Sequence, residues 1–229
     1  MLKFENVCKT YENTNIEALD NINLTIEKGE FIFLVGQSGA GKSTLIKMMT
    51  VEETPTSGEV TINDVDVVRL KKKEIPYYRR TLGMVYQDFR LLENKNVLDN
   101  VAFAMKVVGA SSRLIRRRIP DVLYRVGLSS KAKFLPNQLS GGEQQRVAIA
   151  RAITNNPGII IADEPTGNLD PNTSKEIMQC LEDINKSGTT IIVATHDKDI
   201  VNTMHKRVIE IQGGKIVRDD ERGGYTENE

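Results

Sequence analysis

The chain has 229 residues, of which 39% are hydrophobic and 27% charged, so it can bury a sizeable core and has an ordinary globular composition. Lys and Arg together number 31, as do Asp and Glu, so no overall field favours nucleic acid, and we expect no nucleic-acid partner. No apolar run approaches the roughly 18 residues that span a bilayer, so a role at a membrane would need a separate membrane partner. The two cysteines, Cys8 and Cys180, are far apart, which favours buried thiols in a reducing compartment.

The first quarter of the chain predicts an antiparallel sheet beside a strand–loop–helix unit. Alternating or continuous apolar residues predict strands at Leu2–Val7, Ile22–Ile26 and Phe31–Val35. A glycine-rich turn then leads into a helical segment, Lys42–Met49, and a hairpin is predicted at Glu59–Val67.

Residues 91–138 have a helical pattern with few β-branched runs, and we interpret them as a helical subdomain inserted into the core. One stretch places four apolar side chains on a single helical face: Ile115, Ile119, Val122 and Val126. Arg113, Arg116 and Arg117 gather on another face of that helix. This basic face is either a solvated surface, which we favour, or a contact for anionic lipid headgroups.

The last part of the chain alternates helices and strands, which predicts a parallel α/β core. The predicted elements are helices at Gln144–Ile153 and Ser174–Ile184, buried strands at Ile159–Ala162 and Thr190–Ala194, and a hairpin of Arg207–Ile211 with Lys215–Val217. The predicted fold class is therefore α/β, with a mixed core sheet, an antiparallel β subdomain and the inserted α-helical subdomain. We expect one domain over residues 1–218 and a flexible acidic tail over 219–229.

The segment Gly36–Ser43 matches the phosphate-loop pattern G-x-x-x-x-G-K-[ST] between a buried strand and a helix. Glycines let the backbone N–H groups approach phosphate oxygens, and the start of the helix adds partial positive charge. We expect Lys42 to reach the β- and γ-phosphates, Ser43 to ligate Mg²⁺ and Thr44 to lie near the α-phosphate. A plain glycine turn is the disfavoured alternative. The residues expected to bind nucleotide here are Gly36, Ser38, Gly39, Ala40, Gly41, Lys42, Ser43 and Thr44.

Two carboxylates, Asp163 and Glu164, stand at the end of the apolar strand that begins at Ile159. Ligands gather at the carboxyl ends of parallel strands, so these side chains should face the phosphate loop. Asp163 is the expected partner of Mg²⁺ through its water shell, and Glu164 the expected general base for the attacking water. Solvated acids that merely cap a strand are the alternative, which the neighbouring glycine loop disfavours.

A second anion site is predicted at Ser140, Gly141 and Gly142, at the start of a helix with unsatisfied N–H groups and little side-chain bulk. The same spacing also fits a capping box between Ser140 and Glu143, and from spacing alone the capping box is the better interpretation.

The order and spacing of these motifs, together with Gln87, Gly167–Asp170 and His196, resemble the nucleotide-binding domains of ABC transporters over residues 2–218. Leu139–Glu143, with the sequence LSGGE, is the most specific element. The resemblance implies a P-loop NTPase fold, hydrolysis of Mg-ATP, and a head-to-tail homodimer that forms on ATP binding. In such a dimer, Ser140–Gly142 of one subunit would close over ATP held by the other.

The resemblance also implies roles for single residues. Tyr11 stands where the family stacks an aromatic ring on adenine, although a plain strand-end tyrosine remains an alternative. Gln87 matches the glutamine that contacts Mg²⁺ and the attacking water. His196 matches the histidine that contacts the γ-phosphate and steadies Glu164, and Asp170 belongs to a loop that reaches across the dimer.

Finer features, above all Gln87–Leu92, resemble the cell-division branch of the family. Asp163–Asp170 also fits this branch but is shared with related subfamilies, so it discriminates less. That resemblance implies an integral membrane partner docked near Phe89–Leu92 and the helical subdomain. It also implies a peripheral location on the cytoplasmic face of the bacterial membrane at the division site, and control of peptidoglycan hydrolases. An ATPase of the lipoprotein-release or macrolide-efflux type is the alternative. A nucleotide-gated adaptor with little turnover is a further one, which the presence of Glu164 and His196 argues against.

Overall fold

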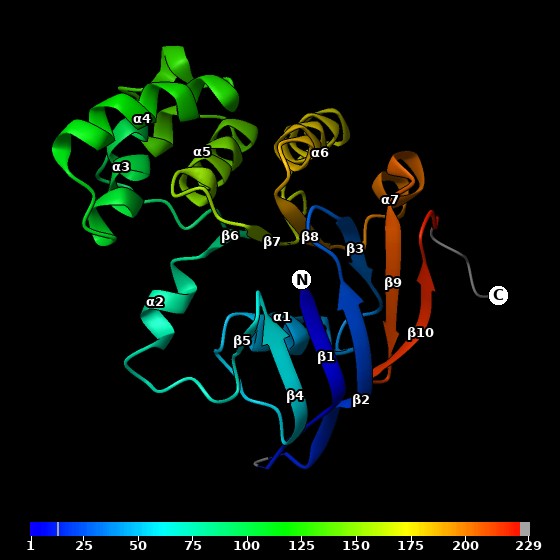
Figure 1. The fold of residues 1–229 in the computed structure, drawn as a ribbon. Coiled ribbons are helices and arrows are strands. Elements are labelled where there is room, and N and C mark those ends of the chain that lie inside the picture. The colour runs from blue at the N-terminus through cyan, green and yellow to red at the C-terminus, as the bar shows by residue number, and fades with distance from the viewer. Residues whose placement is uncertain (13, 225–229) are drawn as a thin grey trace.

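The computed structural model describes residues 1–12 and 14–224 and contains two sheets (Figure 1). The strands of the larger sheet are β3 (Phe31–Val35), β6 (Leu82–Tyr86), β7 (Ile159–Asp163), β8 (Thr190–Ala194), β9 (Arg207–Gln212) and β10 (Lys215–Asp220). Their order is β10-β9-β3-β8-β7-β6, and all neighbours pair in parallel except β10, which runs antiparallel to β9. The expected mixed core sheet is thus confirmed.

The smaller sheet is antiparallel and has the order β2-β1-β4-β5. Its strands are β1 (Leu2–Tyr11), β2 (Ile16–Ile26), β4 (Ser57–Ile62) and β5 (Val65–Asp66). The turn between β4 and β5 places Asn63 and Asp64 at φ of 48° and 63°, the left-handed geometry that closes two-residue hairpins. The predicted hairpin in this region is therefore confirmed.

The apolar strands of the core sheet are buried on both faces, which is why they contain almost no polar residues. In β3, Phe31, Phe33 and Val35 join one hydrophobic cluster, whereas Ile32 and Leu34 join the other. The second cluster also contains side chains of the small sheet and of α1 (Lys42–Met49), so this helix is packed between the two sheets. The carboxyl end of β3 and the first turn of α1 are consequently fixed relative to each other.

The predicted helical subdomain is built from α3 (Val97–Val107), α4 (Ser112–Arg125) and the 3₁₀ turns η1 (Ser129–Lys131) and η2 (Pro136–Gln138). It packs against α5 (Gly141–Ile153), on the side away from the four-stranded sheet (Figure 1). The four apolar side chains that the sequence placed on one face of α4 are all buried, and Arg113, Arg116 and Arg117 are exposed.

Asn100 of α3 is fully buried and holds the segment that enters this subdomain. Its Nδ2 donates to the backbone oxygens of Leu92, Lys95 and Asn96, and its Oδ1 accepts from the N–H of Leu92. A buried amide with all these partners avoids the cost of an unpaired polar group.

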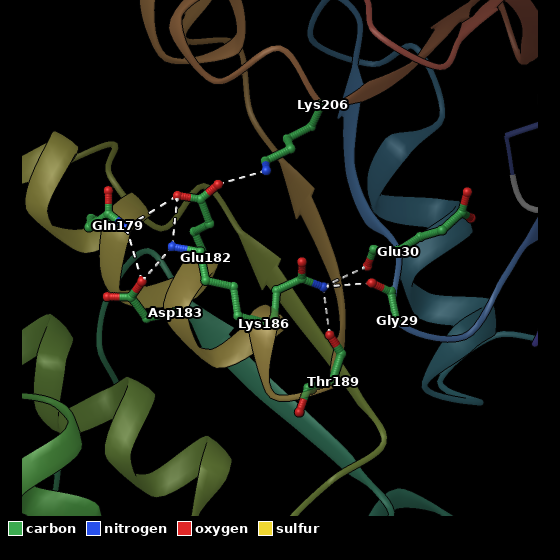
Figure 2. Close-up of polar contacts among 9 residues, drawn as sticks. Gly29, Glu30, Gln179, Glu182, Asp183, Lys186, Thr189 and Lys206 are labelled. Atoms are coloured by element: carbon green, nitrogen blue, oxygen red, sulfur yellow. Dashed lines mark hydrogen bonds and ion pairs between the residues drawn. The ribbon is translucent and has the colours of Figure 1, made fainter.

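The remaining helices are α2 (Ile75–Arg79), α6 (Pro171–Lys186) and α7 (Lys198–Met204). Among the described residues, none of the helices combines the length and the apolar content needed to cross a membrane. The carboxyl end of α6 is tied to the start of β3 by Asn185, whose Nδ2 donates to the oxygens of Gly29 (2.9 Å) and Thr189 (2.8 Å). Figure 2 shows the polar network beside it, in which Glu182 contacts Lys206 at 2.6 Å.

The expected domain boundary at residue 218 falls inside β10. Strand β10 continues to Asp220, because Arg207 of β9 holds Asp219 through two hydrogen bonds of 2.7 Å. The N–H of Gly223 also donates to Lys206, so residues 219–224 lie against the body of the protein. The rest of the expected flexible tail, residues 225–229, is outside the described residues.

Candidate functional site

The phosphate loop, Gly36–Ser43, joins the buried strand β3 to α1 as the sequence predicted. Gly36 has φ of 146°, and a Cβ there would lie 2.2 Å from the backbone oxygen of Ile211, so only glycine fits. The first turn of α1 has no acidic residue, and its N-cap, Gly41, provides no side-chain cap. The N–H groups at this helix start are therefore available to an anion, which the helix dipole would also favour.

Lys42 lies folded over the loop that precedes it. Its Nζ donates to the backbone oxygens of Gly36 (2.6 Å) and Gln37 (3.0 Å), which leaves one of its three donors for a ligand. Ser43 is exposed beside it, and Gly39–Thr44 line a hollow of about 100 Å³. A positive side chain, a hydroxyl and free N–H groups thus line one small hollow.

Tyr11, at the end of β1, contacts Thr44, one of the residues that line this hollow. Its hydroxyl lies 3.4 Å from Oγ1 of Thr44, which is buried. The tyrosine therefore stands at the edge of the phosphate loop, although it comes from the other sheet.

The carboxylates and the histidine meet at the ends of two neighbouring strands. Asp163 pairs with Ala194 in the β7–β8 register, and the N–H of Glu164 donates to the oxygen of Ala194 (2.9 Å). Glu164 has φ of 49°, a left-handed conformation that turns it out of the strand. Nδ1 of His196, just after β8, lies 2.9 Å from Oε1 of Glu164. The His196 side chain is 73% exposed and that of Glu164 only 20%, so the histidine covers the carboxylate on its solvent side.

The charge around Asp163 connects the strand end to the phosphate loop. Burial raises the pKa of Asp163, the charge of Glu164 raises it further, and the ammonium of Lys42 acts in the opposite direction. The negative charge of a half-buried carboxylate is unfavourable beside a second carboxylate unless positive charge lies close to it. This position is therefore suited to a cation.

Gln87 follows β6, the strand beside β7, and so joins the same edge of the sheet. Asn168 donates to the backbone oxygen of Gln87 (3.1 Å), and its Oδ1 accepts from Nε2 of the Gln87 side chain (3.3 Å). Sequence reasoning did not single out Asn168, although it lies inside the Gly167–Asp170 motif. Asp170 itself caps α6, accepting from the N–H groups of Asn172 and Thr173, both at 3.1 Å.

Arg151 of α5 is a second residue that the sequence did not reveal. Its Nη2 donates to the backbone oxygen of Phe89 (2.7 Å), and its Nη1 donates to that of Arg90. Phe89 and Arg90 have φ of 57° and 50°, a conformation that costs energy for residues other than glycine. Arg151 thus holds the strained turn after Gln87 against α5, the helix whose N-cap is Ser140. No local pattern distinguishes it from Arg146, the other arginine on α5.

The second predicted anion site begins that helix. Ser140 caps α5: its Oγ accepts from the N–H of Glu143 (3.2 Å), and Oε2 of Glu143 accepts from the N–H of Ser140 (2.9 Å). The pKa of Glu143 is lowered, first by the hydrogen bond from the Ser140 N–H and then by Lys131. The capping box is therefore confirmed.

Across residues 1–12 and 14–224, no hydrogen bond or ion pair joins Ser140–Gly142 to the phosphate loop. The two predicted anion sites are therefore separate within this part of the chain. The ammonium of Lys42 acts on Asp163 at the first, whereas Glu143 and Lys131 lie beside Ser140 at the second.

A family model described as ABC transporter matches residues 19–167, which include the phosphate loop, the LSGGE segment and both carboxylates. The chain belongs to this ABC transporter family. It is 56% identical to the cell division ATP-binding protein FtsE of Bacillus subtilis, over 98% of both chains. It is 53% identical to the protein of the same name from Mycobacterium tuberculosis, again over 98% of both.

Among solved structures, the chain is similar to the dimeric, post-hydrolysis structure of the ATP-binding cassette MJ0796 bound to ADP and Pi. The TM-score is 0.86 and the identity 39%, over 98% of this chain and 100% of that one. The expected P-loop ABC ATPase fold is thereby confirmed. As a member of this family the chain is an ATPase, which binds ATP and hydrolyses it to ADP and phosphate.

Proposed function

We propose that the edge of the core sheet at β3, β7 and β8 is the ATP site, with the roles that the sequence predicted. The phosphates would be held by the free N–H groups at the start of α1 and by Lys42. Thr44 would lie near the α-phosphate and Tyr11 against the adenine. The Nζ of Lys42 has one donor to spare, and the hollow at Gly39–Thr44 opens to solvent, as a phosphate chain requires.

Mg²⁺ fits the oxygen donors that the phosphate loop and the ends of β6 and β7 supply. Ser43, Asp163 and Gln87 offer hydroxyl, carboxylate and amide oxygens, the ligand types that Mg²⁺ takes directly or through water. The raised pKa of Asp163, which burial and Glu164 produce, supports a cation at this position. When bound, the ion would neutralise charge that builds up on the phosphate oxygens.

Glu164 is the proposed general base, and His196 would hold it in place. An ionised carboxylate only accepts hydrogen bonds, so Nδ1 of His196 must be the donor in their 2.9 Å contact. This contact fixes the carboxylate, and the His196 ring is exposed enough to meet a γ-phosphate. The Glu164–His196 pair beside an uncapped helix start is the observation that carries the proposed hydrolytic role.

The Glu164→Gln variant tests that role. We expect it to bind ATP like the wild type but to lose turnover and to accumulate as a dimer in Mg-ATP. Binding and turnover are measured by calorimetry and phosphate release, and mass by light scattering. Wild-type turnover in this variant would exclude Glu164 as the base.

The second anion site supports a homodimer. Ser140–Gly142 lies apart from the phosphate loop of its own chain, so its natural ligand is nucleotide held by a second copy. The similar cassette MJ0796 is dimeric in its structure with ADP and Pi. In the dimer, Ser140 would donate its hydroxyl to the phosphates, beside the N–H groups at the start of α5. Gly142 is needed for packing within its own chain, since a Cβ there would lie 2.3 Å from Cγ2 of Thr173.

We further propose that this ATPase works in cell division with an FtsX-like integral membrane protein. It would bind that partner on the cytoplasmic face of the bacterial membrane at the division site and control peptidoglycan hydrolysis from there. The full-length similarity to FtsE proteins supports this role over the lipoprotein-release or macrolide-efflux alternative. Docking near Phe89–Leu92 would place the partner on the turn that Arg151 holds.

Affinity capture of the tagged chain from native membranes tests the partner. An FtsX-like protein should be recovered, and its recovery should fall when Phe89 is replaced by Asp. Recovery of a substrate-carrying permease in its place would contradict the division role and leave the ATPase assignment intact.

A further inference from the structure

The side chain of Asn168 forms hydrogen bonds with both the backbone and the side chain of Gln87. Its Nδ2 donates to the backbone oxygen of Gln87 at 3.1 Å, and its Oδ1 accepts from Nε2 at 3.3 Å. The two residues are 81 positions apart and are brought together because they follow the neighbouring strands β6 and β7. The loop after β7 thus holds the side chain of Gln87, which lies on the loop after β6.

Chemistry fixes the direction of both amides. The oxygen and nitrogen of an amide have nearly the same shape, so their partners decide which is which. The backbone oxygen of Gln87 can only accept, so the NH₂ group of Asn168 must face it. Oδ1 of Asn168 then faces the Gln87 side chain and also only accepts, so Gln87 must present Nε2 to it. Within the described chain, Oε1 of Gln87 is left without a hydrogen-bond partner.

Gly167 makes this close approach possible. A Cβ at this position would lie 2.8 Å from Nε2 of Gln87 and 3.1 Å from its Cδ. Gly167 does not adopt a positive φ, so the glycine is required for space and not for backbone conformation. A methyl group here would displace the Gln87 amide while the backbone could keep its path.

We propose that Asn168 is a positioning residue for metal binding, which orients the Gln87 amide so that its oxygen is the atom offered to Mg²⁺. This inference rests on the metal role proposed above for Gln87. Mg²⁺ binds oxygen, whereas a reversed amide would offer N–H groups, whose partial positive charge repels a cation. Asn168 would therefore act on the ion through Gln87 without touching it.

Metal affinity tests the proposal directly. Mn²⁺ replaces Mg²⁺ as the probe, and its free concentration is followed by electron paramagnetic resonance with the full chain and a non-hydrolysable ATP analogue. Asn168→Ala should weaken Mn²⁺ binding about tenfold, the typical effect of removing a residue that orients a metal ligand. Asn172→Ala is the matched control, since Asn172 is exposed and its side chain makes no hydrogen bond to other described residues. It should bind Mn²⁺ like the wild type.

Two further measurements separate positioning from general damage. Analogue affinity in excess EDTA should be unchanged in Asn168→Ala, and Gly167→Ala should reproduce the loss of Mn²⁺ affinity with Asn168 intact. In a Gln87→Ala background, Asn168→Ala should cause no additional loss, because its effect passes through Gln87.

Three results would overturn the proposal: wild-type Mn²⁺ affinity in Asn168→Ala, an equal loss in the Gln87→Ala background, or an equal loss of analogue affinity in EDTA. Unchanged Mn²⁺ affinity in Gln87→Ala itself would instead remove the metal role proposed for Gln87, and with it this inference. The roles of Lys42 and Glu164 would be untouched.

Discussion

Arg151 gives a prediction about how the two halves of the site are coupled. Its guanidinium donates to the backbone oxygens of Phe89 and Arg90, and both residues have positive φ. Burial lowers the pKa of Arg151, so the group is partly desolvated and its hydrogen bonds are not simply exchanged for water. Replacing Arg151 by Met removes two charge-assisted hydrogen bonds and leaves the strained turn unsupported.

The expected loss follows from those two bonds. Hydrogen bonds from charged groups contribute about 1.5–3 kcal/mol each, and water would replace part of that on the exposed side of the turn. We therefore expect Arg151→Met to lower the free energy of unfolding by about 2–4 kcal/mol. For a chain of this size that is a fall in Tm of roughly 4–16 °C. Arg151→Lys should lose about half as much, because an ammonium cannot hold two oxygens in a fixed fork.

Hydrogen exchange over residues 87–92, read by mass spectrometry, distinguishes a local role from a global one. Arg151→Met should speed exchange in this segment, whereas ATP affinity should be kept because Arg151 does not touch the phosphate loop. Arg146→Met is the control: Arg146 lies on the same helix but contacts Val126 and Glu176. If both variants raised exchange over 87–92 equally, or neither did, the coupling assigned to Arg151 would be wrong.

Two other predictions concern stability. Lys206 lowers the pKa of Glu182 through a 2.6 Å hydrogen bond. The pair therefore stabilises the fold at any pH above the ordinary pKa of a glutamate. This stabilisation disappears as the pH falls through the lowered pKa of Glu182 in the folded protein. Glu182→Gln should lower the free energy of unfolding, measured with urea, by about 1 kcal/mol at neutral pH and leave it unchanged in strong acid. Asp183 is exposed, so Asp183→Asn should have a smaller effect in the same measurement. Gly36→Ala should lower the free energy of unfolding by at least about 2 kcal/mol and abolish ATP binding, because its methyl group would clash with the backbone oxygen of Ile211. A Cβ on Gly39 would meet no atom within 4 Å, so Gly39→Ala should add only backbone strain of about 1 kcal/mol. A thermal melt in which both glycine variants fell equally would show that the close approach at Gly36 does not matter.

The sequence predicted the elements that are defined by apolar content. β3, β8 and α1 have the expected bounds, because continuous apolar strands and a phosphate-loop helix leave little choice. α6 begins three residues earlier than predicted, at Pro171, because Asp170 caps it and proline suits the first helical turn.

β6 and α2 could not be recognised. β6 is as long as β3 and β8, but Gly83 interrupts its apolar run. α2 has five residues with Pro76 in its first turn and is too short to show a helical period. β6 nevertheless matters, because it carries Gln87 to the carboxyl edge of the sheet.

The candidate site could be predicted where motifs are local and could not where contacts are distant. The phosphate loop, Asp163 and Glu164 are read from adjacent residues. The contacts of Arg151 with Phe89 and of Asn168 with Gln87 join residues 62 and 81 positions apart, so they depend on strand order. A single sequence contains no such information.

ATP binding by Lys42 tests the central claim most directly. Titration calorimetry of the wild type with Mg-ATP should show saturable binding. Lys42→Ala should bind at least about tenfold more weakly, because a charge-assisted hydrogen bond from an ammonium to a phosphate contributes more than the roughly 1.4 kcal/mol that corresponds to a tenfold change in affinity. Lys47→Ala, an exposed lysine on the same helix, should bind like the wild type. No heat with the wild type, or equal affinity in wild type and Lys42→Ala, would contradict the account.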